Sequence, residues 1–234
     1  MSLIPGAVNF RDIGGLPAGG GRTRSGVLYR SGNLAAVDEV GGAAFRALGV
    51  RRVIDLRSDD EVAHAPSRVG DVEMMRVPLF LGSVTSFFIE DISLVEMYRA
   101  LLERSGDRLV TAIRGILDAQ PVVVHCTVGK DRTGLTVALA LAAAGVDEDA
   151  VVADYALTEQ NLPAWRGDRT LARIRAAFPD AKHLEELATK SPAPAMRGVL
   201  DQLRAEHGSA AGFLRAHGMT QGELDRLRAV LVED

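Results

Sequence analysis

A single cysteine, Cys126, lies in a stretch whose residue types could carry out nucleophilic chemistry on a phosphate. The stretch, residues 121–134, reads Pro-Val-Val-Val-His-Cys-Thr-Val-Gly-Lys-Asp-Arg-Thr-Gly. Its three consecutive valines predict a short buried strand, and the alanine- and leucine-rich segment 135–144 predicts a buried helix. The cysteine is therefore expected in a loop that joins the end of a strand to the start of a helix.

A loop of this kind is suited to bind phosphate. Successive backbone N–H groups point into one concavity, and the helix dipole adds positive potential there. Arg132, six residues after Cys126, has a planar guanidinium that can bind two phosphate oxygens, which a lysine cannot do. Helix-terminal and cationic surroundings favour the thiolate form of a cysteine. A thiolate held against a bound phosphate is an activated nucleophile.

The string His-Cys-x-x-Gly-Lys-x-Arg-Thr-Gly resembles the signature loop of the cysteine-dependent protein tyrosine phosphatases. Its Lys-Asp-Arg segment is similar to the bacterial atypical branch of that superfamily. Members of this branch act on phosphotyrosine, and often on phosphoserine, phosphothreonine and phosphoinositides. The resemblance extends over most of the chain and includes residues 9–15, 28–32, 53–58 and 154–155 and the segment 218–231.

The loop and the resemblance together predict hydrolysis of phosphoric monoesters in two steps. Cys126 attacks phosphorus, and water then hydrolyses the phosphocysteine. Arg132 and the loop amides hold the equatorial oxygens, which is the electrostatic contribution expected to dominate phosphoryl transfer. The residues whose backbone is expected to bind phosphate include Thr127, Val128, Gly129 and Lys130. We expect no cofactor, and the sequence has no His/Cys cluster at metal-ligand spacing.

The general acid is the least determined of these roles. Many tyrosine phosphatases take it from a Trp-Pro-Asp loop, but Trp165, the single tryptophan, is followed by Arg-Gly. Asp131 is the nearest candidate, and the resemblance implies this loop position. Its basic neighbours favour the carboxylate, whereas a bound phosphate and the thiolate favour the protonated form. Asp55 and Asp59 are the alternatives.

Other residues of the loop region are expected to support it. His125 should fix the loop through hydrogen bonds, with general base as the weaker alternative, and Asp55 should assist from behind the loop. Thr133 could donate its hydroxyl to the thiolate, or could simply bond to backbone at the helix start. Gly129 lets the backbone turn without a Cβ, and Gly134 permits close helix packing.

Three basic residues are candidates for substrate contacts. Lys130 could reach a second anionic group, because related lipid-phosphatase loops carry lysine there, and the alternative is a solvated lysine at the rim. The resemblance implies that Arg11 lines the mouth of the site, and the alternative is a surface ion pair with Asp12. Arg57 follows the predicted strand 51–56 and is expected at its carboxyl end.

Strand-like and helix-like segments alternate as far as residue 145. Segments 92–102 and 109–117 show helical periodicity, and Ser58 followed by Glu61 three residues later predicts a capped helix start. The alternation predicts an α/β fold with a mostly parallel central sheet flanked by helices. Ligands in such sheets bind at the carboxyl ends of strands, where the cysteine loop lies. The C-terminal third reads as all-helical. We expect one domain, residues 1–234, in which residues 160–195 form either a helical lid or a permanent neighbour of the site.

Composition limits the partners and the compartment. The net charge of −4 argues against a general nucleic-acid binder. One cysteine cannot form an internal disulfide, so the fold does not depend on an oxidising compartment. No signal peptide is visible, and the apolar stretch 135–146 is too short to span a bilayer. We expect a cytoplasmic protein, with signal-independent secretion left open, that acts on a phosphotyrosine protein or a phosphoinositide; the oligomeric state stays open.

Two other functions use a phosphate-binding loop. A nucleotide-binding loop of the form G-x-x-x-x-G-K-[ST] is rejected, because Val124 replaces the first glycine and Asp131 replaces the final Ser/Thr. A catalytically inactive module that binds a phosphorylated ligand on the same fold remains the alternative. Intact Cys126 and Arg132 argue against it.

Overall fold

Val122, Val123 and Val124 have β-branched side chains that favour extended backbone, and they form most of the central strand of the protein. The computed structural model describes residues 2–79, 89–162 and 164–234, with the backbone alone over 164–170. Its main sheet has the order β1-β4-β7-β5-β6. The strands are β1 (Arg11–Asp12), β4 (Leu28–Ser31), β5 (Arg52–Asp55), β6 (Glu73–Arg76) and β7 (Val122–His125). Only β1 pairs antiparallel, so the mostly parallel sheet is confirmed.

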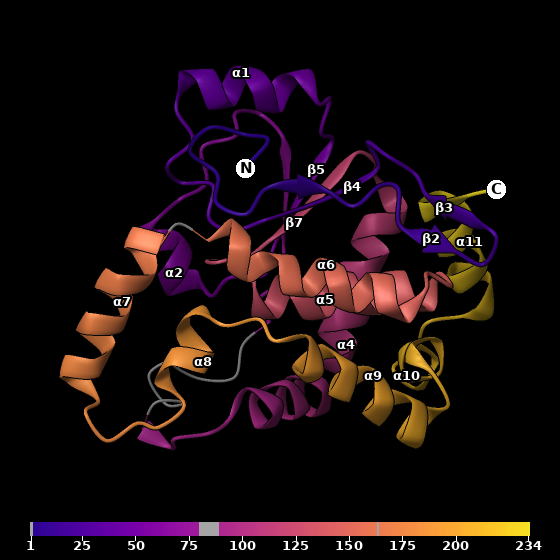
Figure 1. Cartoon of the computed structure of the whole chain (residues 1–234). Helices are drawn as coiled ribbons and strands as arrows, with labels where there is room; N and C mark the ends of the chain where they lie inside the picture. Colours follow the sequence, from indigo (N-terminus) through magenta and orange to yellow (C-terminus); the bar gives the residue numbers. More distant parts are fainter. Residues whose placement is uncertain (1, 80–88, 163) are drawn as a thin grey trace.

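The sheet buries side chains on both faces, as a parallel sheet does. Val122 and Val124 enter the larger core, while Val123 enters a smaller core with Phe10 and Phe45. This alternation follows the two-residue period of a strand. Figure 1 shows α1 (Glu39–Ala47) on one side of the sheet and α4 (Leu94–Asp118), α5 (Asp131–Ala143) and α6 (Glu148–Asn161) on the other.

The carboxyl ends of three neighbouring strands lie in register. Ser31 of β4 pairs with His125 of β7, and His125 pairs with Asp55 of β5. The chain leaves β7 immediately after His125 and enters the cysteine loop. The loop therefore begins at the sheet edge where ligands of parallel sheets bind.

Side-chain caps fix several helix starts. Asp38 accepts a hydrogen bond from the Gly41 amide at the start of α1. Ser58 and Glu61 form the predicted capping box of α2 (Asp59–His64). The remaining helices are α7 (Ala164–Ala177), α8 (Leu184–Thr189), α9 (Ala193–His207), α10 (Ala210–Ala216) and α11 (Gln221–Leu231).

The C-terminal third is mostly, but not wholly, helical. A second sheet of order β2-β3-β8 joins β2 (Pro17–Ala18) and β3 (Gly21–Thr23) to β8 (Val232–Glu233). Val232 pairs antiparallel with Thr23 and is buried. Strand β8 was not predicted, because two residues are too few to show the alternation of buried and exposed side chains that marks a strand in sequence.

The segments predicted as two helices at 92–102 and 109–117 form one element, α4, with a kink at Ser105. Within the described part of the chain, no helix is both long enough and apolar enough to cross a bilayer.

Candidate active site

The cysteine loop joins β7 to α5 and lies against the backbone that follows β4. The Asn33 amide donates to the Thr127 carbonyl at 3.0 Å. Gly129 adopts φ +75°, and a Cβ there would lie 2.6 Å from backbone atoms of Ser31 and Gly32. Only glycine fits this position, because the conformation and the contact both exclude a side chain. The loop is thus held in a fixed path over the end of β4.

Cys126 lies at the floor of the loop, with 3% of its surface exposed. The Gly129 amide donates to its Sγ at 3.3 Å. An amide donor stabilises a thiolate more than a thiol, because it supplies partial positive charge to the anion. The loop amide is therefore directed at the sulfur atom that is the candidate nucleophile.

Arg132 is bound at one edge by a carboxylate. Its Nη1 and Nη2 donate to the two oxygens of Glu61, each at 2.7 Å. Glu61 also accepts a hydrogen bond from the Thr127 hydroxyl and, as part of the capping box, from the Ser58 amide. Glu61 thus occupies the two terminal nitrogens, and no carboxylate among the described residues pairs with the Nε edge of the guanidinium.

Sequence reasoning found Glu61 only as a capping residue. Burial raises the pKa of Glu61, but the hydrogen bonds and charge of Arg132 outweigh it and bring the value to about 2. Burial lowers the pKa of Arg132, but its hydrogen bonds to Glu61 and the charge of Cys126 outweigh this effect. The pKa of Arg132 is therefore raised above its usual value. The signal that could have found Glu61 is its place: a capping box directly after β5, at the same sheet edge as the loop.

A cavity of about 180 Å³ opens above Cys126. Its lining combines the loop with α2 on one side and the helical segment 171–189 on the other. The lining residues are Glu61, Cys126, Thr127, Val128, Lys130, Asp131, Arg132, Ile174, Leu187 and Ala188. Cys126, Arg132 and Asp131, the candidate nucleophile, phosphate ligand and general acid, thus share one cavity. Helices α7 and α8 supply the apolar wall of this cavity. Both helices lie within residues 160–195, the segment predicted from sequence to be either a lid or a permanent neighbour of the site.

Of the three candidate acids, Asp131 alone is among the residues that line this cavity. Its side chain is 23% exposed. Asp59 is almost fully exposed and pairs with Arg76 at 2.8 Å. Asp55 is buried beside Arg57. The positions of Asp55 and Asp59 do not fit a proton donor to a substrate in this cavity.

Arg57 forms a two-point ion pair with Asp55, at 2.9 and 2.7 Å, and its side chain is fully buried. It also donates to the Ala65 carbonyl. Burial raises the pKa of Asp55, but the Arg57 hydrogen bonds hold it below its usual value. The predicted role of Arg57 as a phosphate ligand does not fit this position, since its donors are already used behind the loop.

His125 is fully buried between this ion pair and the loop. Its Nδ1 lies 3.2 Å from the Cys126 carbonyl oxygen, and its Nε2 lies 3.5 Å from Asp55. Burial lowers the pKa of His125 from 6.5 to about 4, despite the opposing charge of Asp55. The ring is therefore neutral at neutral pH, and its position suits a residue that fixes the loop.

This burial predicts a loss of stability in acid. Between pH 6.5 and 4 the unfolded chain binds a proton at His125 that the folded chain does not, so stability falls as pH falls through this window. Between pH 7 and pH 4 the free energy of unfolding should fall by roughly 3 kcal/mol more in the wild type than in His125→Gln. Urea unfolding at both pH values measures this, with His64→Gln as an exposed control. An equal decline in wild type and His125→Gln would refute it.

A buried ionic network holds the outer side of the loop. Arg30 donates to the Gly129 carbonyl at 2.8 Å and to Asp154 at 2.6 Å. Asn9 donates to the same carbonyl at 3.0 Å, and Arg11 binds Asp154 at 2.8 Å. With the Gly129 carbonyl held outward by two donors, the adjoining amides are free to face the cavity.

In this network Arg11 is mostly buried and pairs with Asp154, so it forms neither the surface pair with Asp12 nor a cavity wall. Burial and the charge of Arg30 lower the pKa of Arg11 to about 10, which keeps it charged at neutral pH. Two guanidinium groups share one carboxylate, and the excess positive charge lies next to the loop. The sequence predicted a role for Arg11 at the mouth of the site, but it predicted none for Arg30 or Asp154.

Lys130 is buried, with 1% of its side chain exposed. Its ammonium donates to the carbonyls of Glu186, Leu187 and Lys190 at 3.1, 2.9 and 2.9 Å. These carbonyls lie at the end of α8, where the helix dipole favours a cation. The structure therefore shows neither a solvated rim lysine nor a free cation awaiting a second phosphate.

Thr133 and Gly134, in the first turn of α5, pack tightly. Thr133 is fully buried, and its hydroxyl lies 3.5 Å from the Ser31 carbonyl, which matches the reading as a helix-start residue bonded to backbone. A Cβ on Gly134 would lie 3.0 Å from the ring of Tyr155, so glycine permits the close approach of α6 to α5.

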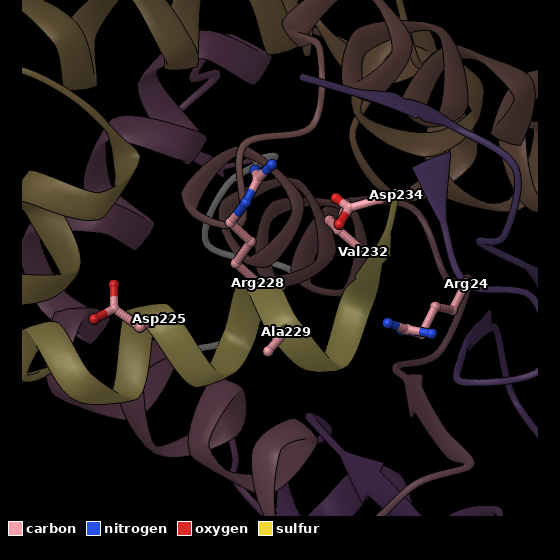
Figure 2. A pocket seen from close by; sticks show the side chains of 6 residues that line it. All are labelled: Arg24, Asp225, Arg228, Ala229, Val232 and Asp234. Carbon is pink, nitrogen blue, oxygen red and sulfur yellow. The ribbon is translucent and has the colours of Figure 1, made fainter. Parts of the chain in front are cut away.

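A second cavity, of about 320 Å³, shares no residue with the first. Figure 2 shows its lining side chains, which come from α11, the C-terminal residues and Arg24. Arg228 within it donates to the Ala144 carbonyl at 2.9 Å and so satisfies the end of α5. This cavity contains structural contacts and none of the residues of the cysteine loop.

Comparison with known proteins agrees with this site. A family model described as "Tyrosine phosphatase family" matches residues 3–233. The triple specificity protein phosphatase PtpB of Mycobacterium tuberculosis is 34% identical, over 98% of this chain and 98% of its own. A tyrosine-protein phosphatase of Nostoc commune is 29% identical, over 87% of this chain and 74% of its own. With its cysteine, arginine and aspartate in one cavity at the carboxyl edge of the sheet, this chain belongs to the tyrosine phosphatase family.

Proposed function

We propose that this protein hydrolyses phosphotyrosine in proteins through a phosphocysteine at Cys126. The observation that carries the proposal is the single cavity shared by Cys126, Asp131 and Arg132. The Cys126 thiolate forms the S–P bond as the bond from phosphorus to the tyrosine oxygen breaks, and Asp131 gives its proton to that oxygen. Water then attacks phosphorus, a proton returns to Asp131, and the thiolate leaves.

Arg132 and the loop amides supply the electrostatic stabilisation of this reaction. The Gly129 amide already points at Sγ, and the guanidinium is oriented by Glu61. These donors are in place before substrate arrives, so little reorganisation is needed as charge develops. The same preorganisation argues against a module that only binds phosphorylated ligands.

The cavity wall favours an aromatic phosphate ester. Ile174, Leu187 and Ala188 face the loop from α7 and α8. An apolar wall gains free energy against a phenyl ring but leaves the hydroxyls of an inositol ring without partners. Lys130, which would meet a second phosphate, is bound by three carbonyls. The PtpB relative is named a triple specificity protein phosphatase. We propose that this chain also hydrolyses phosphoserine and phosphoinositides, but more slowly than phosphotyrosine.

The test measures phosphate release, in EDTA, from a phosphotyrosine peptide, the matching phosphoserine peptide and a phosphoinositide in vesicles. We expect the phosphotyrosine peptide to have the highest kcat/KM, by about tenfold or more. Ile174→Ala should lower that value by roughly tenfold, since loss of apolar contact is worth this much. Leu171→Ala, on the same helix but outside the cavity lining, is the control. A preference for the phosphoinositide would contradict the substrate assignment, and tight phosphopeptide binding without turnover would favour the binding module.

A further inference from the structure

Two buried tyrosines approach the candidate acid from behind. The Tyr98 hydroxyl donates to Oδ1 of Asp131 at 2.9 Å. The Lys130 ammonium lies 3.2 Å from the same oxygen. Oδ2 of Asp131 accepts no hydrogen bond from any residue that the structure describes. The two oxygens of this carboxyl group are therefore in different surroundings.

Tyr155 completes the arrangement. Its hydroxyl lies 2.7 Å from that of Tyr98, and the two rings meet edge to face with centroids 6.1 Å apart. Both residues are fully buried, Tyr98 on α4 and Tyr155 on α6. Tyr98 has one proton and gives it to Asp131, so Tyr155 is the donor between the two hydroxyls. The bonds run in one direction, from Tyr155 through Tyr98 to Asp131, and each strengthens the next.

Both tyrosines remain neutral donors at working pH. Burial and the charge of Asp131 raise the pKa of Tyr98 well above its usual value. The same two causes raise the pKa of Tyr155. Neither hydroxyl can therefore take part as an acid or base itself, and what remains for them is to hold and polarise the carboxyl group.

We propose that Tyr98, held by Tyr155, is a positioning residue that turns the Asp131 carboxyl group so that Oδ2 carries the catalytic proton. Because Oδ1 accepts the Tyr98 hydrogen bond and lies 3.2 Å from the Lys130 ammonium, a proton on Asp131 resides on Oδ2. In the first step the Oδ2–H bond breaks and the proton passes to the leaving oxygen. The negative charge left on Asp131 is then stabilised at Oδ1. This inference rests on the proposed role of Asp131 as general acid.

The Tyr98 hydroxyl and the Lys130 ammonium both stabilise the negative charge that Asp131 carries once its proton has left. A tyrosine leaving group, with an ordinary pKa of ~10, gains from protonation by such a group. The other charged groups that act on Asp131 and the tyrosines are Arg132, the Cys126 thiolate, Glu61 through Arg132, Arg30 and Glu186.

The experiment compares Tyr98→Phe and Asp131→Asn on two substrates, a phosphotyrosine peptide and 4-nitrophenyl phosphate. The nitrophenol leaving group is much more acidic and departs with little protonation. Tyr98→Phe should lower kcat for the peptide about tenfold and change the nitrophenyl reaction little. Tyr155→Phe should act in the same direction with a smaller effect.

A double variant separates positioning from general structural damage. Tyr98→Phe combined with Asp131→Asn should be no slower than Asp131→Asn alone, because Tyr98 acts through Asp131. Tyr29→Phe is the matched control: it is buried, and its hydroxyl bonds to no described residue. Affinity for inorganic phosphate should be unchanged in the three single tyrosine-to-phenylalanine variants, which reports an intact loop.

Three results would overturn the inference in distinguishable ways. Equal losses on both substrates in Tyr98→Phe, or additive losses in the double variant, would make Tyr98 only structural. An Asp131→Asn variant with no selective loss on the peptide would remove the acid on which Tyr98 acts. No turnover of either substrate by the wild type would overturn the proposed function itself.

Discussion

Replacing Cys126 by serine is expected to abolish hydrolysis of the phosphotyrosine peptide while leaving the peptide bound. Serine keeps the size of the side chain, so the loop over it should persist. Its hydroxyl is not ionised at neutral pH, and His125, fully buried and bonded to the Cys126 carbonyl, is not placed to act as its base. Loss of a nucleophile that acts with its site costs on the order of 10⁴-fold or more in kcat. Phosphate release measures the loss of hydrolysis, and calorimetry measures whether the peptide still binds.

The sequence makes the Cys126→Ser test unusually clear, because it contains no second cysteine to replace the first. Wild-type protein treated in parallel with EDTA serves as the control for metal-dependent contamination. Turnover by Cys126→Ser within tenfold of wild type would show that another group attacks phosphorus.

Replacing Arg132 by lysine is expected to lower kcat/KM roughly 10³-fold, the scale of an arginine that stabilises a transferring phosphoryl group. Lysine keeps the charge but not the planar fork, so it cannot bind two phosphate oxygens and Glu61 together. Loss of the two-point bond to Glu61 also frees the end of the side chain from its fixed orientation. Steady-state kinetics and the Kd for inorganic phosphate report the two effects.

Arg76→Lys is the matched control for that variant. The Arg76 side chain is 34% exposed, pairs with Asp59 and is not among the residues lining the cavity. Its activity should equal that of wild type. If Arg132→Lys behaved like Arg76→Lys, the fork geometry would not be what stabilises the transferring group.

Local patterns predicted much of this fold. The three valines of β7 predicted a buried strand, and the alternation of strands and helices predicted the mostly parallel sheet. Together they predicted the sheet edge at which the loop lies. The three-residue spacing of Ser58 and Glu61 predicted where α2 begins. These features depend on neighbours within a few residues, which is the range over which propensity and capping act.

The partners of the charged side chains could not be read from the chain. Arg57 turns back to Asp55, two residues away, instead of toward a ligand. Lys130 reaches carbonyls almost sixty residues further along. In each case a long flexible side chain meets whichever acceptor the tertiary fold brings within reach, and nothing near it in sequence identifies that acceptor.

The apolar wall and the tyrosine pair were missed for a related reason. Tyr98 lies in the apolar stripe of α4, and by spacing alone it is a core aromatic residue. Only the approach of α4 and α6 to the start of α5 brings its hydroxyl to Asp131. Leu187 likewise looks like a packing residue until α8 lies over the loop.

The central claim is that the phosphoryl group passes through Cys126. It is tested most directly by quenching the wild-type reaction with acid during turnover of the phosphotyrosine peptide and analysing the digested protein by mass spectrometry. We expect a phosphoryl group on the peptide that contains Cys126 in wild type, and none in Cys126→Ser. Steady turnover with no phosphoryl group on that peptide, or with the group on another residue, would contradict the claim.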